Sequence, residues 1–215
     1  MRFAHGVLPA AGVMGLADLL ILMGLPYDSW EGVELAEVIM ARIQSAAHAA
    51  SGQLGAEYGP YPAWGPGQGV SRRNATVTTI APTGTLAMVA GCSSGCEPIF
   101  GVAFGKNVLG DESLYQVDAA FSYAMESRGL PVTDELLGRI AANGGSVQGL
   151  AEVPKDVQRL CRTALEIDWV WHVRMQAALQ KHTDNAVSKT INLPNDATEA
   201  DVRSAILFAY DEGCK

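Results

Sequence analysis

Charged residues are scarce in this 215-residue sequence, and basic residues are the scarcer kind. Lys and Arg number 15 against 23 Asp and Glu, which gives a formal net charge of −8 at pH 7. Nucleic-acid-binding proteins normally present a basic face, whereas the one basic pair here, Arg72-Arg73, is isolated. The composition argues against a nucleic-acid partner, and a polyanionic ligand would have to be held locally.

The sequence also lacks a hydrophobic run long enough to cross a membrane. Its most apolar stretch, residues 19–25, is far shorter than the roughly 20 residues that a transmembrane helix needs. The start of the chain superficially resembles a secretory signal, but Asp18 interrupts its apolar part and no polar cleavage region follows. We therefore expect no membrane partner and a cytoplasmic location.

No Cys-x-x-Cys pair occurs among the cysteines, which are Cys92, Cys96, Cys161 and Cys214. Cys92 and Cys96 could form half of a metal site. Structural zinc needs two further ligands at suitable spacing, however, and no other His or Cys lies nearby in the sequence. We expect small buried thiols in a reducing compartment and no metal site.

Hydrophobic periodicity predicts a helix-rich chain with isolated strands. Residues 75–80 are rich in β-branched side chains, and residues 186–193 alternate, with Val187, Lys189 and Ile191 on one face. Each strand precedes a helix, which favours an α/β fold with parallel strands. Two strands cannot complete a sheet, so their partners should lie elsewhere. The predicted helices span residues 12–23, 29–50, 85–90, 114–126, 135–142, 154–164 and 172–181, with a last one starting at Thr198.

A loop of small residues, Pro82-Thr83-Gly84-Thr85, follows the first predicted strand. Gly84 lets the backbone approach a ligand, and the threonine hydroxyls and the free N–H groups of the next turn could bind an anion without a lysine. This is not a Walker A loop, because no Gly-Lys-Ser/Thr follows. A second small-residue loop, residues 91–95, lies close by. Locally, a strand-to-helix turn without a ligand is an equally good interpretation.

Longer strings in the same regions resemble the adenosylcobalamin-dependent (class II) ribonucleotide reductases. The first is RNATVTTIAPTGTLAMVAGCSSGCEPIF, residues 73–100. The second is WHVRMQAALQKHTDNAVSKTINLPNDATEADVRSAILFAYDEGCK, residues 171–215. GVMGLADLLILMGLPYDS, residues 12–29, fits the segment that precedes them in that family. The resemblance thus covers nearly the whole chain.

This resemblance implies a fold and a substrate. The family forms a ten-stranded α/β barrel, in which a cysteine thiyl radical attacks the ribose of a ribonucleotide and adenosylcobalamin is the cofactor. We therefore expect residues 1–215 to be a single partial domain, the C-terminal part of that barrel. In the family the Pro-Thr-Gly-Thr loop holds the substrate phosphates at a helix N-terminus. The expected substrate-binding residues are Pro82, Thr83, Gly84, Thr85 and Leu86, and residues 91–95 would line the same active-site mouth.

The sequence departs from the family in two respects. Cys96 stands where an aliphatic residue is expected. The Asn-x-Cys-x-Glu loop that carries the thiyl cysteine, and the redox-active cysteine pair, do not occur in residues 1–215. We therefore expect a fragment cut at both ends, without catalytic residues and inactive by itself, whose partner is the missing N-terminal part of a reductase chain. The resemblance leaves open a dimer of the intact enzyme.

Several polar residues that could be taken for catalytic groups have structural interpretations. His172 is expected to be a packed or capped histidine. His182 and Asp184 suggest a catalytic triad, but no serine or cysteine nucleophile lies near them in the sequence. Glu97, the one carboxylate near the two loops, could line the site or cap the next turn. The alternative function is a stand-alone, non-catalytic nucleotide- or phosphate-binding module.

Overall fold

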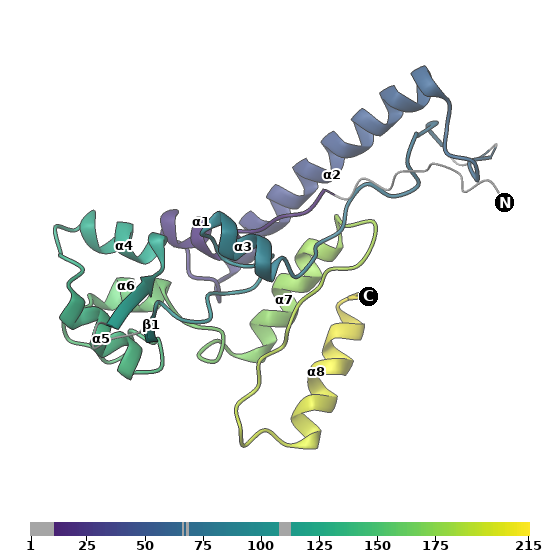
Figure 1. Cartoon of the computed structure of the whole chain (residues 1–215). Coiled ribbons are helices and arrows are strands. Elements are labelled where there is room, and N and C mark those ends of the chain that lie inside the picture. Colours follow the sequence, from purple (N-terminus) through teal and green to yellow (C-terminus); the bar gives the residue numbers. More distant parts are fainter. Residues whose placement is uncertain (1–10, 66, 68, 108–112) are drawn as a thin grey trace.

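The computed structural model describes residues 11–65, 67, 69–107 and 113–215, and helices dominate this part of the chain. The long helix α2 projects from the molecule, whereas α4, α5 and α6 gather with the strands at the opposite end, and α8 lies below α7 (Figure 1). The helices are α1 (Leu16–Leu22), α2 (Trp30–Tyr58), α3 (Gly84–Ala90), α4 (Ala119–Glu126), α5 (Asp134–Ala142), α6 (Lys155–Leu160), α7 (Trp169–Gln180) and α8 (Glu199–Asp211), and the strands are β1 (Ala103–Asn107) and β2 (Ser113–Val117).

Polar caps set the starts of three helices where the sequence predicts them. Ser29 Oγ accepts a hydrogen bond from Gly32 N–H at the start of α2. Thr133 caps α5 in the same way, and Thr198 forms a capping box with Asp201 at the start of α8. Such caps satisfy N–H groups that have no acceptor within the helix. Other predicted helices exist with different ends, since α1 begins at Leu16, α6 ends at Leu160 and α7 begins at Trp169.

The two predicted strands run parallel, but they form single bridges instead of continuous strands. Thr78 pairs with Ala11, and Ile80 pairs with Val187, both in parallel orientation. Residues 75–80 thus divide their hydrogen bonds between two neighbours, and the chain turns into α3 soon after Ile80. The parallel direction is confirmed, whereas the predicted strand lengths are wrong within the described residues.

The prediction of one helix over residues 114–126 is wrong in its first part. Residues Ser113–Val117 form β2, which pairs antiparallel with β1, and α4 starts only at Ala119. Asp118 separates the two elements because its carboxylate accepts a hydrogen bond of 2.9 Å from Phe121 N–H and so caps α4. The apolar spacing fits a helix, but pairing with β1 and this cap override it.

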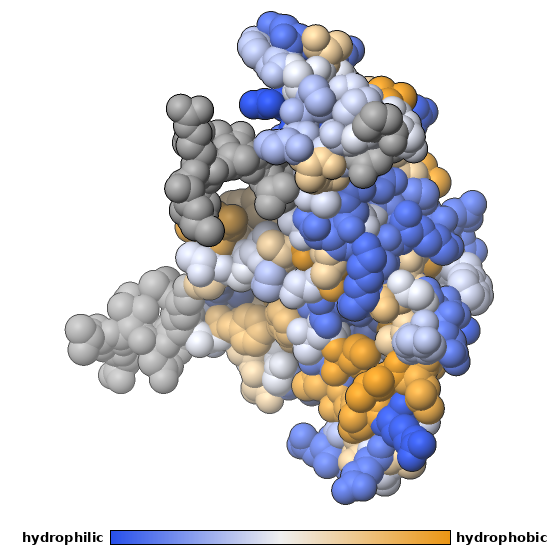
Figure 2. All heavy atoms as spheres, turned by 90° about the vertical axis from the view of Figure 1, so that its right-hand side faces the viewer, coloured by the Kyte–Doolittle hydropathy of each residue, from blue (hydrophilic) through white to orange (hydrophobic). Residues whose placement is uncertain are grey.

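The hydrophobic face predicted for the last helix is largely exposed. The sequence pattern predicts Val202, Ala205, Ile206 and Ala209 as its apolar face, but only Ala205 is buried, and Ile206 is 62% exposed. Figure 2 shows hydrophobic residues gathered on the lower part of one face, where α8 lies in Figure 1. Within the described residues, α8 thus contributes little to the core.

One hydrophobic cluster joins the first helix to the parallel segments near the C-terminus. It contains Leu20 of α1, Met40 of α2, Phe121 of α4 and Met175 of α7, all with no exposed surface, and it extends to Val187. Among the described residues, none of the helices has both the length and the apolar character to cross a membrane. The small-residue loops lie on the edge of this core.

Candidate functional site

The predicted phosphate loop begins α3 with an uncommon backbone conformation. Thr83 precedes the helix with a φ of 51°, in the left-handed region, and no other non-glycine residue of the described chain has a positive φ. β-Branched residues rarely adopt this conformation. The Thr83 hydroxyl does not cap its own helix, because Thr83 Oγ1 accepts a hydrogen bond of 2.7 Å from Gly95 N–H. Thr83 therefore links the two small-residue loops.

The start of α3 is open to solvent. Pro82, Gly84, Thr85 and Leu86 are exposed or partly exposed, and a Cβ added to Gly84 would meet no atom within 4 Å. Ala87 N–H donates to Thr83 O and closes the first turn. The N–H groups of the three preceding residues have no acceptor inside the helix. The structure thus places all five predicted residues around one exposed helix start.

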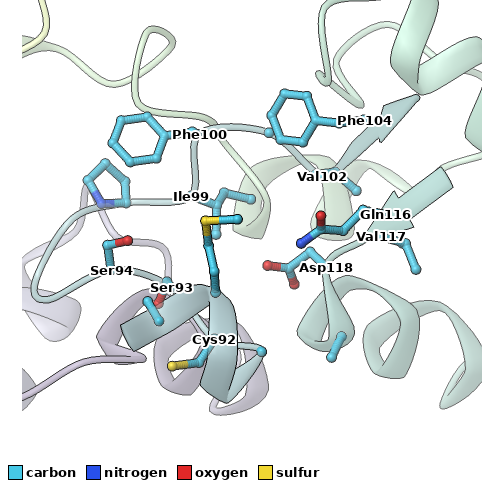
Figure 3. A pocket seen from close by; sticks show the side chains of 16 residues that line it. Cys92, Ser93, Ser94, Ile99, Phe100, Val102, Phe104, Gln116, Val117 and Asp118 are labelled. Atoms are coloured by element: carbon cyan, nitrogen blue, oxygen red, sulfur yellow. The ribbon is translucent and has the colours of Figure 1, made fainter. Parts of the chain in front are cut away.

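The second loop borders a cavity at the other end of α3. This cavity, of about 250 Å³, lies between residues 91–94, the segment leading into β1, and the start of α4 (Figure 3). The side chains of Gln116 and Asp118 point into it. Ala87 and Met88 belong to its lining, but none of the five predicted phosphate-binding residues does. Residues 91–94 therefore line a cavity away from the phosphate loop, and Gly95 contacts that loop.

Two carboxylates fix the walls of that cavity. Asp18 of α1 accepts a hydrogen bond of 2.8 Å from Ser93 N–H through Oδ2, which holds the second loop against α1. Burial raises the pKa of Asp118, and the nearby Asp18 carboxylate raises this pKa further, against the Phe121 N–H bond. Both carboxylates are engaged in holding backbone N–H groups, which is a structural role.

A buried ion pair lies beneath the second loop. Lys189, whose side chain has no exposed surface, forms an ion pair with Glu97. Its ammonium group also donates to His172 Nδ1 at 2.8 Å and to Thr190 O at 2.6 Å. Thr190 N–H in turn donates to Glu97 Oε1 at 2.7 Å. All three ammonium protons thus have acceptors, and Glu97 is neither a wall of an open site nor a helix cap.

His172 completes this buried network as a neutral ring. It has no exposed surface, and its Nε2 lies 3.0 Å from Ala164 O. Because Nδ1 accepts from the Lys189 ammonium, Nε2 carries the proton and donates to that carbonyl. Burial, followed by the positive charge of Lys189, lowers the pKa of His172 to about 4. The prediction of a packed histidine is confirmed.

The four cysteines are free thiols. Cys96 and Cys161 are buried as predicted, whereas Cys92 and Cys214 are half-buried. Burial is the main reason why the pKa of Cys96 and of Cys161 rises to about 12. A thiol is reactive as its thiolate, so both buried cysteines are inert packing residues. Tyr27 OH donates to the Cys96 carbonyl at 2.6 Å and anchors this part of the second loop.

Asp184 does not pair with His182. Its carboxylate lies 3.0 Å from His48 Nε2 of α2 and accepts a hydrogen bond of 2.7 Å from Val77 N–H. Arg72 Nη1 also lies close to this ring, 3.1 Å from His48 Nδ1 and 3.3 Å from His48 Nε2. This arrangement joins α2 to the segment that carries the phosphate loop, so its role is structural.

The depressed pKa of His172 predicts a pH-dependent stability. In the unfolded chain this ring binds a proton near its ordinary pKa of 6.5, but in the folded chain only near pH 4. The free energy of unfolding should therefore be highest above about pH 6.5 and fall toward pH 4, by at most about 1.4 kcal/mol per pH unit from this group. Urea unfolding of the wild type and of His172→Gln at several pH values measures it.

The His172→Gln variant keeps an acceptor and a donor but has no titrating ring. Carboxylates remote from His172 are common to both proteins, so the difference between the two pH profiles reports on the buried network that contains His172. If the two free energies of unfolding keep a constant difference between about pH 6.5 and pH 4, His172 does not have the neutral, buried role assigned to it.

Comparison with known proteins identifies the family. The model of the ribonucleotide reductase barrel domain matches residues 9–72 and 68–215. The chain is 43% identical over 208 residues to a vitamin B12-dependent ribonucleoside-diphosphate reductase of Thermoplasma acidophilum, with 95% of this chain and 27% of that protein covered. A protein of the same name from Mycobacterium tuberculosis is 46% identical over 207 residues, with 93% and 29% covered.

A solved structure shows the same fold. The alpha subunit of a class Id ribonucleotide reductase from Actinobacillus ureae matches with a TM-score of 0.82 at 23% identity, over 96% of this chain and 37% of that one. The chain spans less than a third of the length of the two curated relatives. Its helix-rich architecture is thus part of a reductase barrel, and the chain belongs to the ribonucleotide reductase barrel domain family.

Proposed function

We propose that this chain forms part of a vitamin B12-dependent ribonucleoside-diphosphate reductase, which makes 2′-deoxyribonucleotides for DNA synthesis. Its role in that enzyme is to hold the phosphates of the ribonucleotide substrate at residues Pro82–Leu86. The observation that carries this proposal is the exposed start of α3, in a chain that is 43% and 46% identical to two relatives of that name. Residues 1–215 act as a single partial domain of the barrel.

The start of α3 can bind an anion without a basic side chain. The N–H groups of Gly84, Thr85 and Leu86 have no acceptor within the helix, and a helix N-terminus carries a partial positive charge of about half a unit. The Thr85 hydroxyl adds a donor, and the open space at Gly84 lets a phosphate oxygen approach the backbone. Local dipoles of this kind suit an acidic protein with a net charge of −8.

The radical chemistry is assigned to residues outside this sequence. Adenosylcobalamin, the cofactor that the relatives' names imply, supplies the radical in the intact enzyme. The proposal therefore gives this chain a larger reductase polypeptide as its partner, in the cytoplasm, and no turnover alone.

Substitution of Gly84 by alanine tests the phosphate loop. The added methyl group meets no atom within 4 Å, and Gly84 does not have a positive φ, so the variant should fold as stably as the wild type. The methyl group would occupy the space that a phosphate enters, so we expect the affinity for cytidine diphosphate to fall at least about tenfold. Isothermal titration of the full chain measures both affinities.

Gly65→Ala is the matched control, because its added methyl group also meets no atom within 4 Å but lies in the loop after α2. It should bind cytidine diphosphate like the wild type. Equal affinities for cytidine diphosphate in the wild type and Gly84→Ala would show that the phosphate does not bind at the start of α3. A wild-type chain that binds no cytidine diphosphate at millimolar concentration would contradict the proposed role itself.

A further inference from the structure

The conformation of Thr83 requires support from outside the phosphate loop. Its φ of 51° is unfavourable for a β-branched residue, and such strain persists only where the surrounding structure holds it. The hydrogen bond from Gly95 N–H to Thr83 Oγ1 is a tertiary contact that holds Thr83 in this conformation. The position of Gly95 therefore fixes the direction in which α3 begins.

Gly95 is itself held from two sides. It packs so closely on the phosphate loop that an added Cβ would lie 2.8 Å from Ala81 O. On its C-terminal side, the Tyr27 hydroxyl holds the Cys96 carbonyl, and Glu97 forms the buried ion pair with Lys189. The Glu97 side chain is 10% exposed and that of Lys189 is fully buried, so this end of the loop has few alternative positions.

Lys189 also belongs to the segment that pairs with the approach to the phosphate loop. Ser188 N–H donates to Ile80 O at 2.8 Å, and Ile80 N–H donates to Ala186 O at 3.2 Å. The Glu97–Lys189 pair thus joins the two structures that flank Thr83, which are the second loop and the segment ending at Ile80. His172 orients the Lys189 ammonium from α7.

We propose that Lys189, Glu97 and His172 are positioning residues of the phosphate loop. They keep Gly95 against Thr83 and so aim the first N–H groups of α3 at the ligand. A buried network with every donor and acceptor satisfied has one preferred geometry, which is lost when a member is removed. The identity of the ligand rests on the proposed function, whereas the ordering of the loop does not.

Amide hydrogen exchange of the full chain tests this positioning role. In Lys189→Met the N–H groups of Gly95 and Ala87, which donate to Thr83, should exchange at least about tenfold faster than in the wild type. The amide of Ile140 in the remote helix α5 should change less. Lys181→Met is the matched control, since it removes the same charge from an exposed pair with Glu37 and should leave Gly95 and Ala87 unchanged.

Cytidine diphosphate binding gives an independent readout. We expect the affinity to fall at least about tenfold in folded Lys189→Met and to stay within about twofold in Lys181→Met. If the wild type does not bind the nucleotide, the proposed function fails, but the exchange rates still decide the positioning role. Exchange at Gly95 and Ala87 that is unchanged, or accelerated by the same factor as at Ile140, would overturn it.

A second variant covers the case in which Lys189→Met does not fold. Lys189→Met combined with Glu97→Gln removes both charges, so no unpaired charge stays buried. The same local acceleration at Gly95 and Ala87 is expected there, because the introduced side-chain amide has no ammonium partner to hold it. Wild-type exchange at both backbone amides in this folded variant would also overturn the proposal.

Discussion

Lys189→Met is expected to lower the free energy of unfolding by about 3–5 kcal/mol, the usual cost of removing one partner from a buried ion pair. The Glu97 side chain is 10% exposed and would remain without its cation. The loss would also leave His172 Nδ1 without the donor that lies 2.8 Å away. Urea unfolding of wild type and variant at the same pH measures the difference.

The surface pair Lys181–Glu37 provides the comparison for this prediction. The Lys181 side chain is 58% exposed, and exposed ion pairs contribute about 0–1 kcal/mol, so Lys181→Met should be nearly neutral. Combining Lys189→Met with Glu97→Gln should cost less than the sum of the two single changes, because the two charges are removed together. Strict additivity would mean that Glu97 and Lys189 do not act as a pair.

The sequence indicates one of the two charged residues of this buried pair, but not the other. Lys189 falls on the apolar face of the alternating segment, between Val187 and Ile191. A lysine on a face that is to be buried requires a counter-charge. Its partner Glu97 lies 92 residues away, and no local pattern connects the two. Long-range pairing of this kind follows from the tertiary fold and not from periodicity.

The helices and strands likewise differ in whether nearby residues or tertiary contacts determine them. The caps at Ser29, Thr133 and Thr198 act within one helical turn, so the starts of these three helices follow from nearby residues. The segment before Asp118 is predicted as helix, although its apolar spacing fits both the period of a helix and the alternation of a strand. Its pairing with β1 makes it a strand, and that partner cannot be read from residues 113–117 alone.

The five residues of the proposed phosphate loop are consecutive in the chain, so the sequence can predict them as a set. What the sequence does not predict is the left-handed conformation of Thr83 or its bond with Gly95. Threonine normally avoids this conformation, so local propensity argues against it. A conflict between local preference and observed geometry is typical of functional sites, which supports placing the ligand there.

Phe121→Ala is expected to lower the free energy of unfolding by about 3–5 kcal/mol, the usual range for a buried aromatic ring. Phe121 has no exposed surface and lies in α4, which packs against α1. Removing its ring leaves a cavity in the buried hydrophobic cluster. Urea unfolding followed by circular dichroism measures the loss, with Tyr123→Ala as control in the same helix, since Tyr123 is 59% exposed.

The two large predictions together test whether the chain folds as one unit. Phe121 and Lys189 lie in different parts of the molecule, but one buried cluster extends from Leu16 to Val187. If this cluster is a single core, both substitutions shift the same cooperative transition, and helix content and tryptophan fluorescence change together. Separate transitions, with Phe121→Ala moving only one of them, would divide the described chain into two units. The phosphate loop would then depend only on the unit that contains the Glu97–Lys189 pair.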